Sequence, residues 1–341
     1  MNRSGPAHIA AVLVIVALCC TGFAGPASAH APLSSGSNED IASATLISNP
    51  EKSYAIYSGF HEGGEVQYYR FEMQKGQVLQ GSAGVPAPGS PVPDLVFLGP
   101  GIQPEGTVPP SIQVPAGSSA RLVPGSAPGA PGFEPFSPQP LYQTANFSLI
   151  APESGTYYVA IFGRQEGNYY FAPGFLEQFT AGEAILVPWS IIGIRFWQGQ
   201  GAYEIFAPLA AVLALGIAGI ALRFRKNGQK PGPVALLSIA AGLLCLGSAA
   251  MTAYQLVRTL LATGWVPEAT ITLALIAIPA VIGGAILRAA LRLPDDGTSV
   301  WTGVFLILAG IAGLVFWAGL VIGPVLATAA GILAILHRSG N

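Results

Sequence analysis

The chain has 341 residues, of which 51% are hydrophobic and only 9% are charged, with a formal net charge of −2. A soluble protein carries about 25% charged residues, so this composition is typical of a membrane protein. Between His30 and Gly201 the acidic residues outnumber the basic ones, whereas basic residues gather after Leu222. The acidic balance of residues 30–201 argues against nucleic acid or anionic lipid as a partner of this part of the chain.

Residues 1–29 have the form of a secretory signal peptide. Arg3 supplies a positive start, residues 9–18 are apolar, and Ala27-Ser28-Ala29 is a small-residue cleavage site. Cleavage there would make His30 the mature N-terminus. An uncleaved anchor helix is the alternative, which the short apolar run disfavours.

Residues 30–182 are predicted to form an extracellular all-β domain. Residues 34–40 are polar and expected to be loose, and period-two alternation with turn signals begins near Ala42. The clearest run, 66–73, places Val66 and Tyr68 on one face and Tyr69 and Phe71 on the other. Further runs are 54–57, 77–83, 95–98, 147–150, 155–162 and 169–171. Such spacing is typical of a sandwich or barrel. This part contains no cysteine, so its core must hold it together without disulfides.

The insert at 99–140 is dense in Pro, Gly and Ser, which predicts a long loop or a series of extended segments. Four apolar residues in it offer one further strand pair: Ile112, Val114, Leu122 and Val123. Phe133 and Phe136 are expected to fold back and close the core, since buried rings are the commoner outcome. The alternative is an aromatic contact site.

Three parts of the β region carry a family resemblance. EVQYYRF at 65–71 with KGQ at 75–77, DLVFLGP at 94–100, and SGTYYV at 154–159 with GNYY at 167–170 resemble pre-peptidase C-terminal (PPC-type) domains over residues 42–172. Glu65 and Gln67 stand where that family has aspartates. The resemblance implies a jelly-roll-like β-sandwich that accompanies other modules and binds or positions, without catalytic residues of its own.

The Ser154-Gly155 turn is expected to fix the register of the strand that follows it. Tyr157 and Val159 then share one face, with Tyr158 and Ala160 on the other. A Gly155→Val change is expected to cost roughly 1 to 3 kcal/mol if Gly155 has a positive φ.

Residues 183–200 are predicted to be an interfacial juxtamembrane segment. The apolar run 184–197 would span only ~21 Å as a helix, too short for a bilayer. Ile185, Trp189 and Phe196 fall on one helical face together with Ile192, which indicates a helix lying along the outer leaflet. A last buried strand of the sandwich is the alternative.

Residues 201–341 are predicted to form a polytopic membrane domain of about five helices, at 203–222, 234–254, 269–287, 301–320 and 322–336. Pro279 should kink the third. Basic residues mark one side: Arg223, Arg225, Lys226, Lys230, Arg288, Arg292 and Arg338. By the positive-inside rule the N-terminal domain is extracellular and the C-terminus cytoplasmic. Three pairs of small residues at four-residue spacing favour close helix packing or arise by chance: Ser238/Gly242, Ala309/Gly313 and Ala327/Gly331.

No motif for catalysis is present, so we expect no enzymatic activity and no cofactor. His30 and His61 are candidate metal ligands, because an N-terminal histidine offers both an amine and an imidazole to copper. Two histidines so far apart in sequence are more often ordinary surface residues. Asn146-Phe147-Ser148 is an N-glycosylation sequon on the expected outer side.

The main hypothesis is a membrane-anchored extracellular module that binds or senses a ligand at the cell membrane. Its expected partners are the lipid bilayer and another membrane or cell-surface protein, and not nucleic acid. The first rival is an accessory subunit of a transporter or channel. The second is a copper-binding or copper-delivery protein that uses His30.

Overall fold

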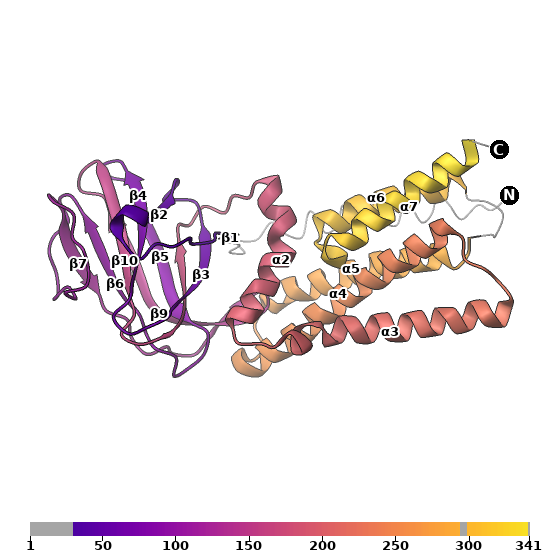
Figure 1. The fold of residues 1–341 in the computed structure, drawn as a ribbon, viewed down its shortest axis with the longest axis horizontal. Helices are drawn as coiled ribbons and strands as arrows, with labels where there is room; N and C mark the ends of the chain where they lie inside the picture. Colours follow the sequence, from indigo (N-terminus) through magenta and orange to yellow (C-terminus); the bar gives the residue numbers. More distant parts are fainter. Residues whose placement is uncertain (1–29, 294–298, 340–341) are drawn as a thin grey trace.

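The computed structural model describes residues 30–293 and 299–339 (Figure 1). The predicted signal peptide, residues 1–29, lies outside the described residues. Two β-sheets form the N-terminal part and a bundle of helices forms the C-terminal part, with helix α2 between them (Figure 1).

The strands form two sheets. Their orders are β1-β3-β11-β5-β9-β8 and β2-β4-β10-β6-β7. Neighbouring strands are antiparallel, except that β1 is parallel to β3 and β2 to β4. The bounds are β1 Ala31–Pro32, β2 Thr45–Ile47, β3 Tyr54–Phe60, β4 Val66–Met73, β5 Val78–Val85, β6 Asp94–Gly99, β7 Ser119–Val123, β8 Gly132–Glu134, β9 Gln139–Ile150, β10 Gly155–Phe162 and β11 Gly167–Pro173.

The main core of the β region lies between the two sheets. Tyr69 and Phe71 of β4 and Tyr157 of β10 belong to it, together with Tyr169 and Phe171 of the other sheet. The rings of Tyr69 and Phe171 lie 4.9 Å apart, centroid to centroid. Aromatic pairs at this distance stabilise a core by about 0.5–1.5 kcal/mol beyond the area they bury.

The opposite face of the second sheet carries a smaller cluster that contains Val66, Tyr68 and Ala160, with Ile112 of the insert packed on it. The predicted division of residues 66–73 and 155–162 into two faces is therefore confirmed. Both faces of β4 are buried at residues 66–69, because loop residues cover the outer one.

The assumption of a positive φ at Gly155 is wrong. Gly155 is not among the described residues with positive φ, so its replacement carries no left-handed strain. The turn before β5 does have a glycine in the left-handed region, since Gly76 has φ +84°.

The Pro-rich insert is more ordered than predicted. Leu122 and Val123 lie in β7, which pairs with β6, whereas Ile112 and Val114 lie outside the strands. Residues 34–40 are also fixed to the sheet. Asn38 is 2% exposed, and it exchanges hydrogen bonds with the backbone of Tyr68.

The expectation that Phe133 and Phe136 close the core is wrong, since neither ring belongs to the core between the sheets. Phe136 instead packs edge-on against Trp317 of the helical part, at 6.4 Å between centroids. The adjacent Pro135 carbonyl accepts a hydrogen bond of 2.6 Å from Thr272 Oγ1. The alternative interpretation, an aromatic contact site, describes this segment better.

Six α-helices follow the sheets in the described part of the chain. They are α2 Ala181–Trp197, α3 Ala202–Asn227, α4 Pro233–Thr263, α5 Ala269–Ala290, α6 Val300–Val315 and α7 Ile322–Ser339. A helix, α2, is thus present at the segment 183–200, and the alternative of a buried strand there is wrong. Helices α3, α4 and α5 are long and apolar enough to cross a membrane. In the most apolar stretch of α3, 18 residues long, only 6% of the residues are buried.

Helix bounds differ most from the predicted ones at α4 and α6, while α3 ends five residues later than predicted and α5 and α7 end three residues later. α4 continues nine residues beyond Tyr254, because its last turns contact the β region. α6 ends at Val315 instead of residue 320, because the backbone turns there: Trp317, Leu320 and Val321 have positive φ. Few non-glycine residues adopt positive φ, so this loop is a defined local structure.

The helices approach one another closely at small residues. A Cβ at Gly242 would lie 2.9 Å from the Gly283 carbonyl oxygen of α5, and one at Gly303 would lie 2.8 Å from that of Gly331 in α7. Ser238, Ala309 and Ala327 are buried at such contacts. The spacing of small residues therefore reflects close packing.

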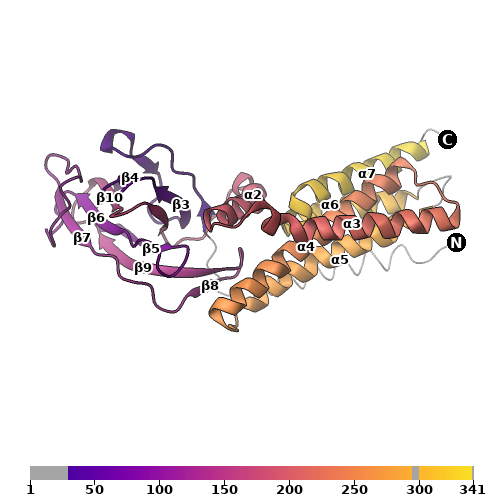
Figure 2. The ribbon, with the colours of Figure 1, turned by 60° about the horizontal axis from the view of Figure 1, so that its bottom comes forward.

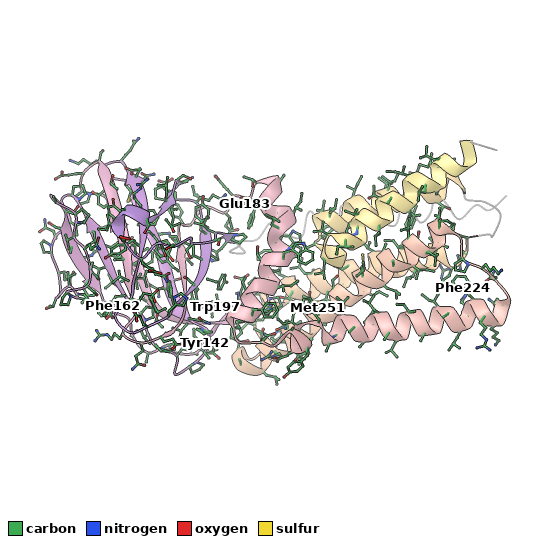
Figure 3. The ribbon with its side chains drawn as sticks, viewed as in Figure 1. Tyr142, Phe162, Glu183, Trp197, Phe224 and Met251 are labelled. Atoms are coloured by element: carbon green, nitrogen blue, oxygen red, sulfur yellow. The ribbon has the colours of Figure 1, made fainter. Side chains whose placement is uncertain are left out.

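The bundle has one end beside the sheets and one end far from them (Figures 1 and 2). The α3–α4 loop and the end of α7 lie at the far end, where Figure 3 also places Phe224. The basic residues 223–230 are therefore separated from the sheets by the length of α3, which is ~39 Å for its 26 residues.

Candidate functional site

A polar groove of about 1150 Å³ lies beside the end of β3. Segments 35–39, 58–61, 86–91, 166–168 and 197–199 contribute to its lining. Glu39 and Glu166 are acidic members of this set, and none of the described lining residues is Lys or Arg. The charged side chains that line the described part of the groove are thus acidic.

Three possible metal ligands meet at the rim of the groove. One ligand atom from each of Glu39, His61 and Glu65 lies within 4.8 Å of the others. His61 Nδ1 is 3.5 Å from Glu65 Oε2. Glu39 and His61 are exposed, whereas the side chain of Glu65 is only 9% exposed. A carboxylate-rich set with one imidazole suits a divalent cation.

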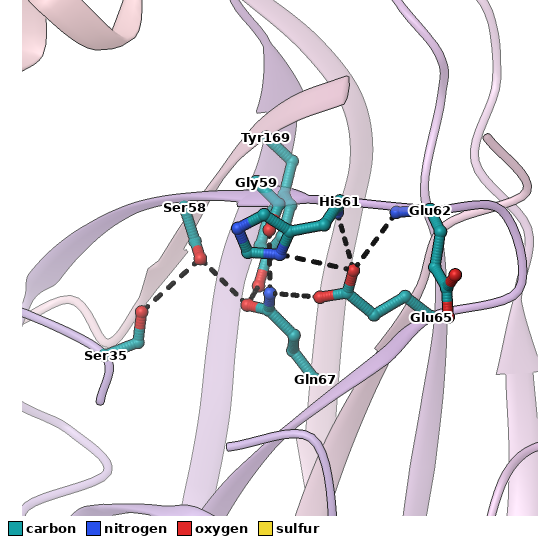
Figure 4. Close-up of polar contacts among 8 residues, drawn as sticks. All are labelled: Ser35, Ser58, Gly59, His61, Glu62, Glu65, Gln67 and Tyr169. Atoms are coloured by element: carbon teal, nitrogen blue, oxygen red, sulfur yellow. Dashed lines mark hydrogen bonds and ion pairs between the residues drawn. The ribbon is translucent and has the colours of Figure 1, made fainter. Parts of the chain in front are cut away.

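A hydrogen-bonded network holds the Glu65 carboxylate in one orientation (Figure 4). Glu65 Oε2 accepts from the backbone N–H of His61 at 2.6 Å, and Oε1 accepts from Gln67 Nε2 at 2.9 Å. Gln67 Oε1 in turn accepts from Ser58 Oγ at 2.8 Å and from the Tyr169 hydroxyl at 2.6 Å. The orientation of the carboxylate is thus set by buried Gln67 of β4 and Tyr169 of β11 and by half-buried Ser58 of β3.

The same contacts set the charge of Glu65. Burial by itself would raise the pKa of this carboxyl, but the hydrogen bonds from Gln67, His61 and Glu62 favour the ionised form and leave the pKa below its ordinary value. Glu65 is therefore a preformed anion at neutral pH.

The wall of the groove nearest the helices is the segment that links α2 to α3. Trp197, Gln198 and Gly199 line it, and α3 begins at Ala202. Trp197 Nε1 donates to the Ser58 carbonyl at 2.8 Å, and its own carbonyl accepts from Asn168 Nδ2 at 2.7 Å. Figure 3 shows Trp197 between the sheets and the helices.

Polar contacts continue from this segment into the bundle. Gln198 Nε2 donates to Gln139 Oε1 of β9 at 2.9 Å. Gln200 and Gln255 of α4 exchange side-chain hydrogen bonds of 3.1 and 2.7 Å. Arg258 of α4 pairs with Glu204 in the first turn of α3. The groove is thus connected through hydrogen bonds to two helices of the bundle.

Two buried ionisable groups lie at the junction between sheets and helices. Burial raises the pKa of Glu134 to about 7, with the nearby Glu177 carboxylate acting in the same direction. Burial lowers the pKa of Arg195 to about 10, and Arg195 is 3% exposed. Neither is in an ion pair among the described residues. Burial also raises the pKa of the neighbouring Tyr57 hydroxyl.

Glu134 should make the junction sensitive to pH. Its pKa in the folded chain, about 7, lies above the ordinary 4.5, so the folded state binds the proton more tightly than the unfolded state. Its contribution to stability is complete below about pH 4.5 and is lost as the pH rises through 7, by ~3 kcal/mol in total.

The measurement is the melting temperature of the full chain in detergent between pH 5 and pH 8. Glu134→Gln should melt higher than the wild type at pH 8 and close to it at pH 5. Glu153→Gln, at an exposed carboxyl, serves as the control. An equal pH dependence of wild type and Glu134→Gln would contradict the assignment.

The structure does not bring His30 and His61 together. They flank opposite ends of the seven-residue strand β3, roughly 20 Å apart, so a single ion cannot bind both. His30 Nδ1 is hydrogen-bonded to Ser53 Oγ, and burial lowers the pKa of His30. Asn146 of the sequon lies exposed in β9, opposite Ser82 of β5.

Few local sequence signals indicated the other site residues. Glu39 and Glu65 lie 26 positions apart by number and meet only because residues 34–40 lie along β4. Arg195 carried one signal, since it is the only charged residue in the apolar run 184–197. Glu134 stands between aromatic and proline residues in the insert, another apolar setting for a carboxyl group.

No family model matches the chain, and no curated protein matches it. Among solved structures it is similar to the crystal structure of Aeromonas hydrophila PliG, a periplasmic lysozyme inhibitor of g-type lysozyme. The match has 16% identity, covers 38% of this chain and 95% of that chain, and has a TM-score of 0.22. At that TM-score the likeness supports no argument about this protein's function.

Proposed function

We propose that this protein is a multi-pass membrane protein whose N-terminal β-sandwich faces outward and binds a ligand without catalysing a reaction. The proposed topology has the sandwich outside, about five spans and the C-terminus in the cytoplasm. Basic residues at the bundle end far from the sheets support this orientation. The PPC-type resemblance of residues 42–172 is part of the same proposal, and a jelly-roll-like sandwich of this kind serves as a binding module.

One observation carries the proposal: the polar groove shares its wall with the linker to the first candidate span. A ligand that contacts Trp197 or Gln198 contacts residues that are hydrogen-bonded to β3 and β9 and that directly precede α3. If the ligand binds one position of this linker more tightly than another, it shifts the equilibrium between the two positions. This arrangement suits a sensor better than a simple anchor.

The proposed ligand carries positive charge. Glu39 and Glu166 line the groove, ionised Glu65 lies at its rim, and no Lys or Arg is among its described lining residues. Such a cleft raises the local concentration of cations. Serine hydroxyls and side-chain amides along the walls provide the hydrogen bonds that a cationic peptide or amine requires.

The test uses the full-length protein in detergent on arrays of cationic, neutral and anionic peptides. We expect retention of cationic peptides, with a loss of at least tenfold in affinity for Glu166→Arg, which reverses a charge in the groove. Glu153→Arg, which reverses an exposed charge outside the groove lining, should bind as the wild type does. Equal binding by the two variants would refute the groove as the site.

Metal binding is the second candidate, favoured by the meeting of Glu39, His61 and Glu65. The same full-length protein in detergent is titrated with Cu(II) and with Zn(II). We expect metal binding that His61→Ala removes and that His30→Ala leaves unchanged. Metal binding that depends on His30 would instead restore the copper-delivery hypothesis. Peptide retention without metal binding would support the first function and refute the second.

A further inference from the structure

A second, smaller cavity lies between α2 and the near end of the bundle, on the other side of the linker from the groove. Its volume is about 80 Å³. Apolar residues from four helices and the α6–α7 loop line most of it: Ile192 of α2, Ile205 of α3, Met251 of α4, Leu275 of α5, and Phe316 with Trp317 after α6. Figure 3 shows Met251 at the end of the bundle beside α2.

One charged side chain lines this cavity. Arg195 is 3% exposed, and its Nη1 donates to Gln198 Oε1 at 3.1 Å. Its Nε is buried and has no hydrogen-bond partner among the described residues. An unpaired buried guanidinium costs several kcal/mol, so such groups are normally paired with an anion.

No carboxylate of the described chain fills that role. Glu134 acts on Arg195 only through space, without an ion pair, and burial raises the pKa of Glu134 to about 7, which reduces its negative charge at neutral pH. Arg258, the other nearby cation, is neutralised by Glu204. The site therefore has an excess of positive charge inside apolar walls.

We infer that this cavity binds the anionic headgroup of a membrane lipid, with Arg195 as its partner and the acyl chain leaving along the apolar wall. A volume of about 80 Å³ admits a headgroup oxyanion and the start of a chain, so most of the chain would remain in the bilayer. The fork of N–H donors on arginine matches phosphate oxygens. This inference is independent of the groove and of its ligand.

The test is the melting temperature of the full chain in neutral detergent. Added 1-palmitoyl-lysophosphatidylglycerol should raise the melting temperature of the wild type by roughly 5 °C at saturation. The zwitterionic lysophosphatidylcholine with the same chain should raise it much less. Arg195→Gln should abolish the difference between the two lipids, and Arg195→Lys, which keeps the charge but not the fork, should retain only part of it. Arg223→Gln, at an exposed cation near the end of α3, serves as the control.

Two further measurements keep the result interpretable. Leu275→Trp narrows the cavity while leaving Arg195 in place, so it should also abolish the lipid effect even if Arg195→Gln fails to fold. Inorganic phosphate at the same concentration should have little effect, because it lacks the chain. Equal shifts by both lipids, a full shift in Leu275→Trp, or a full shift with phosphate alone would each overturn the inference.

Discussion

Replacement of Gly174 by alanine is expected to unfold the β region. Gly174 follows β11 and has φ +86°, a conformation that L-residues rarely adopt. A Cβ there would overlap the Lys52 carbonyl oxygen and lie 2.9 Å from Ser53 N. The backbone of Gly174 or that of Lys52 and Ser53 would have to move, so we expect the free energy of unfolding to fall by ~4 kcal/mol or more.

The effect should be large because this point joins the sheets to α2. Gly174 N donates to the Gln80 carbonyl at 2.7 Å, and Phe175 N donates to the Glu51 carbonyl at 2.8 Å. The neighbouring Lys52 Nζ then forms a 2.7 Å ion pair with Glu183 in the first turn of α2. Displacing this segment would break several of these contacts together.

Gly76→Ala is the matched control. Gly76 has nearly the same φ, +84°, but a Cβ there would meet no atom within 4 Å. It should therefore show only the backbone strain, ~1 kcal/mol. Melting of the full chains in detergent, followed by near-ultraviolet circular dichroism, compares the two. Similar melting temperatures for both variants would show that the close approach to Lys52 is unimportant.

The second large effect is expected for the membrane topology, because a cysteine on one side of the membrane is labelled and one on the other side is not. In a background with Cys19, Cys20 and Cys245 replaced by alanine, Asn227→Cys at the end of α3 and Ser339→Cys at the end of α7 should resist an impermeant thiol reagent in intact cells. Both positions lie at the end of the bundle far from the sheets. Lysine and arginine concentrate at that end, which by the positive-inside rule is cytoplasmic.

Ser111→Cys provides the outer control, since Ser111 is exposed in the insert of the β region. It should label in intact cells, and all three positions should label after lysis. Labelling of Asn227→Cys before lysis would reverse the proposed orientation of α3. Labelling of Ser339→Cys alone would mean that α6 and α7 do not both cross the membrane.

The sequence by itself determined the elements whose signal is local. Period-two alternation identified β4 and β10, and it placed Tyr69 with Phe71 and Tyr157 with Val159 on one face of their own strands, because side-chain direction along a strand depends only on position. Long apolar runs identified α3 and α5 almost to their bounds, because the length and hydropathy of a helix are also local properties.

Tertiary structure alone decided where distant segments meet. The strand order places residues 34–40 beside β4, and so brings Glu39 to His61 and Glu65. Phe136 left the expected core because the insert ends against the bundle, where Trp317 and Thr272 hold it. Arg195 became a buried, partly unpaired cation because four helices and the α6–α7 loop close around it. Local patterns carry no information about such contacts, because they depend on how the sheets and the bundle pack against α2.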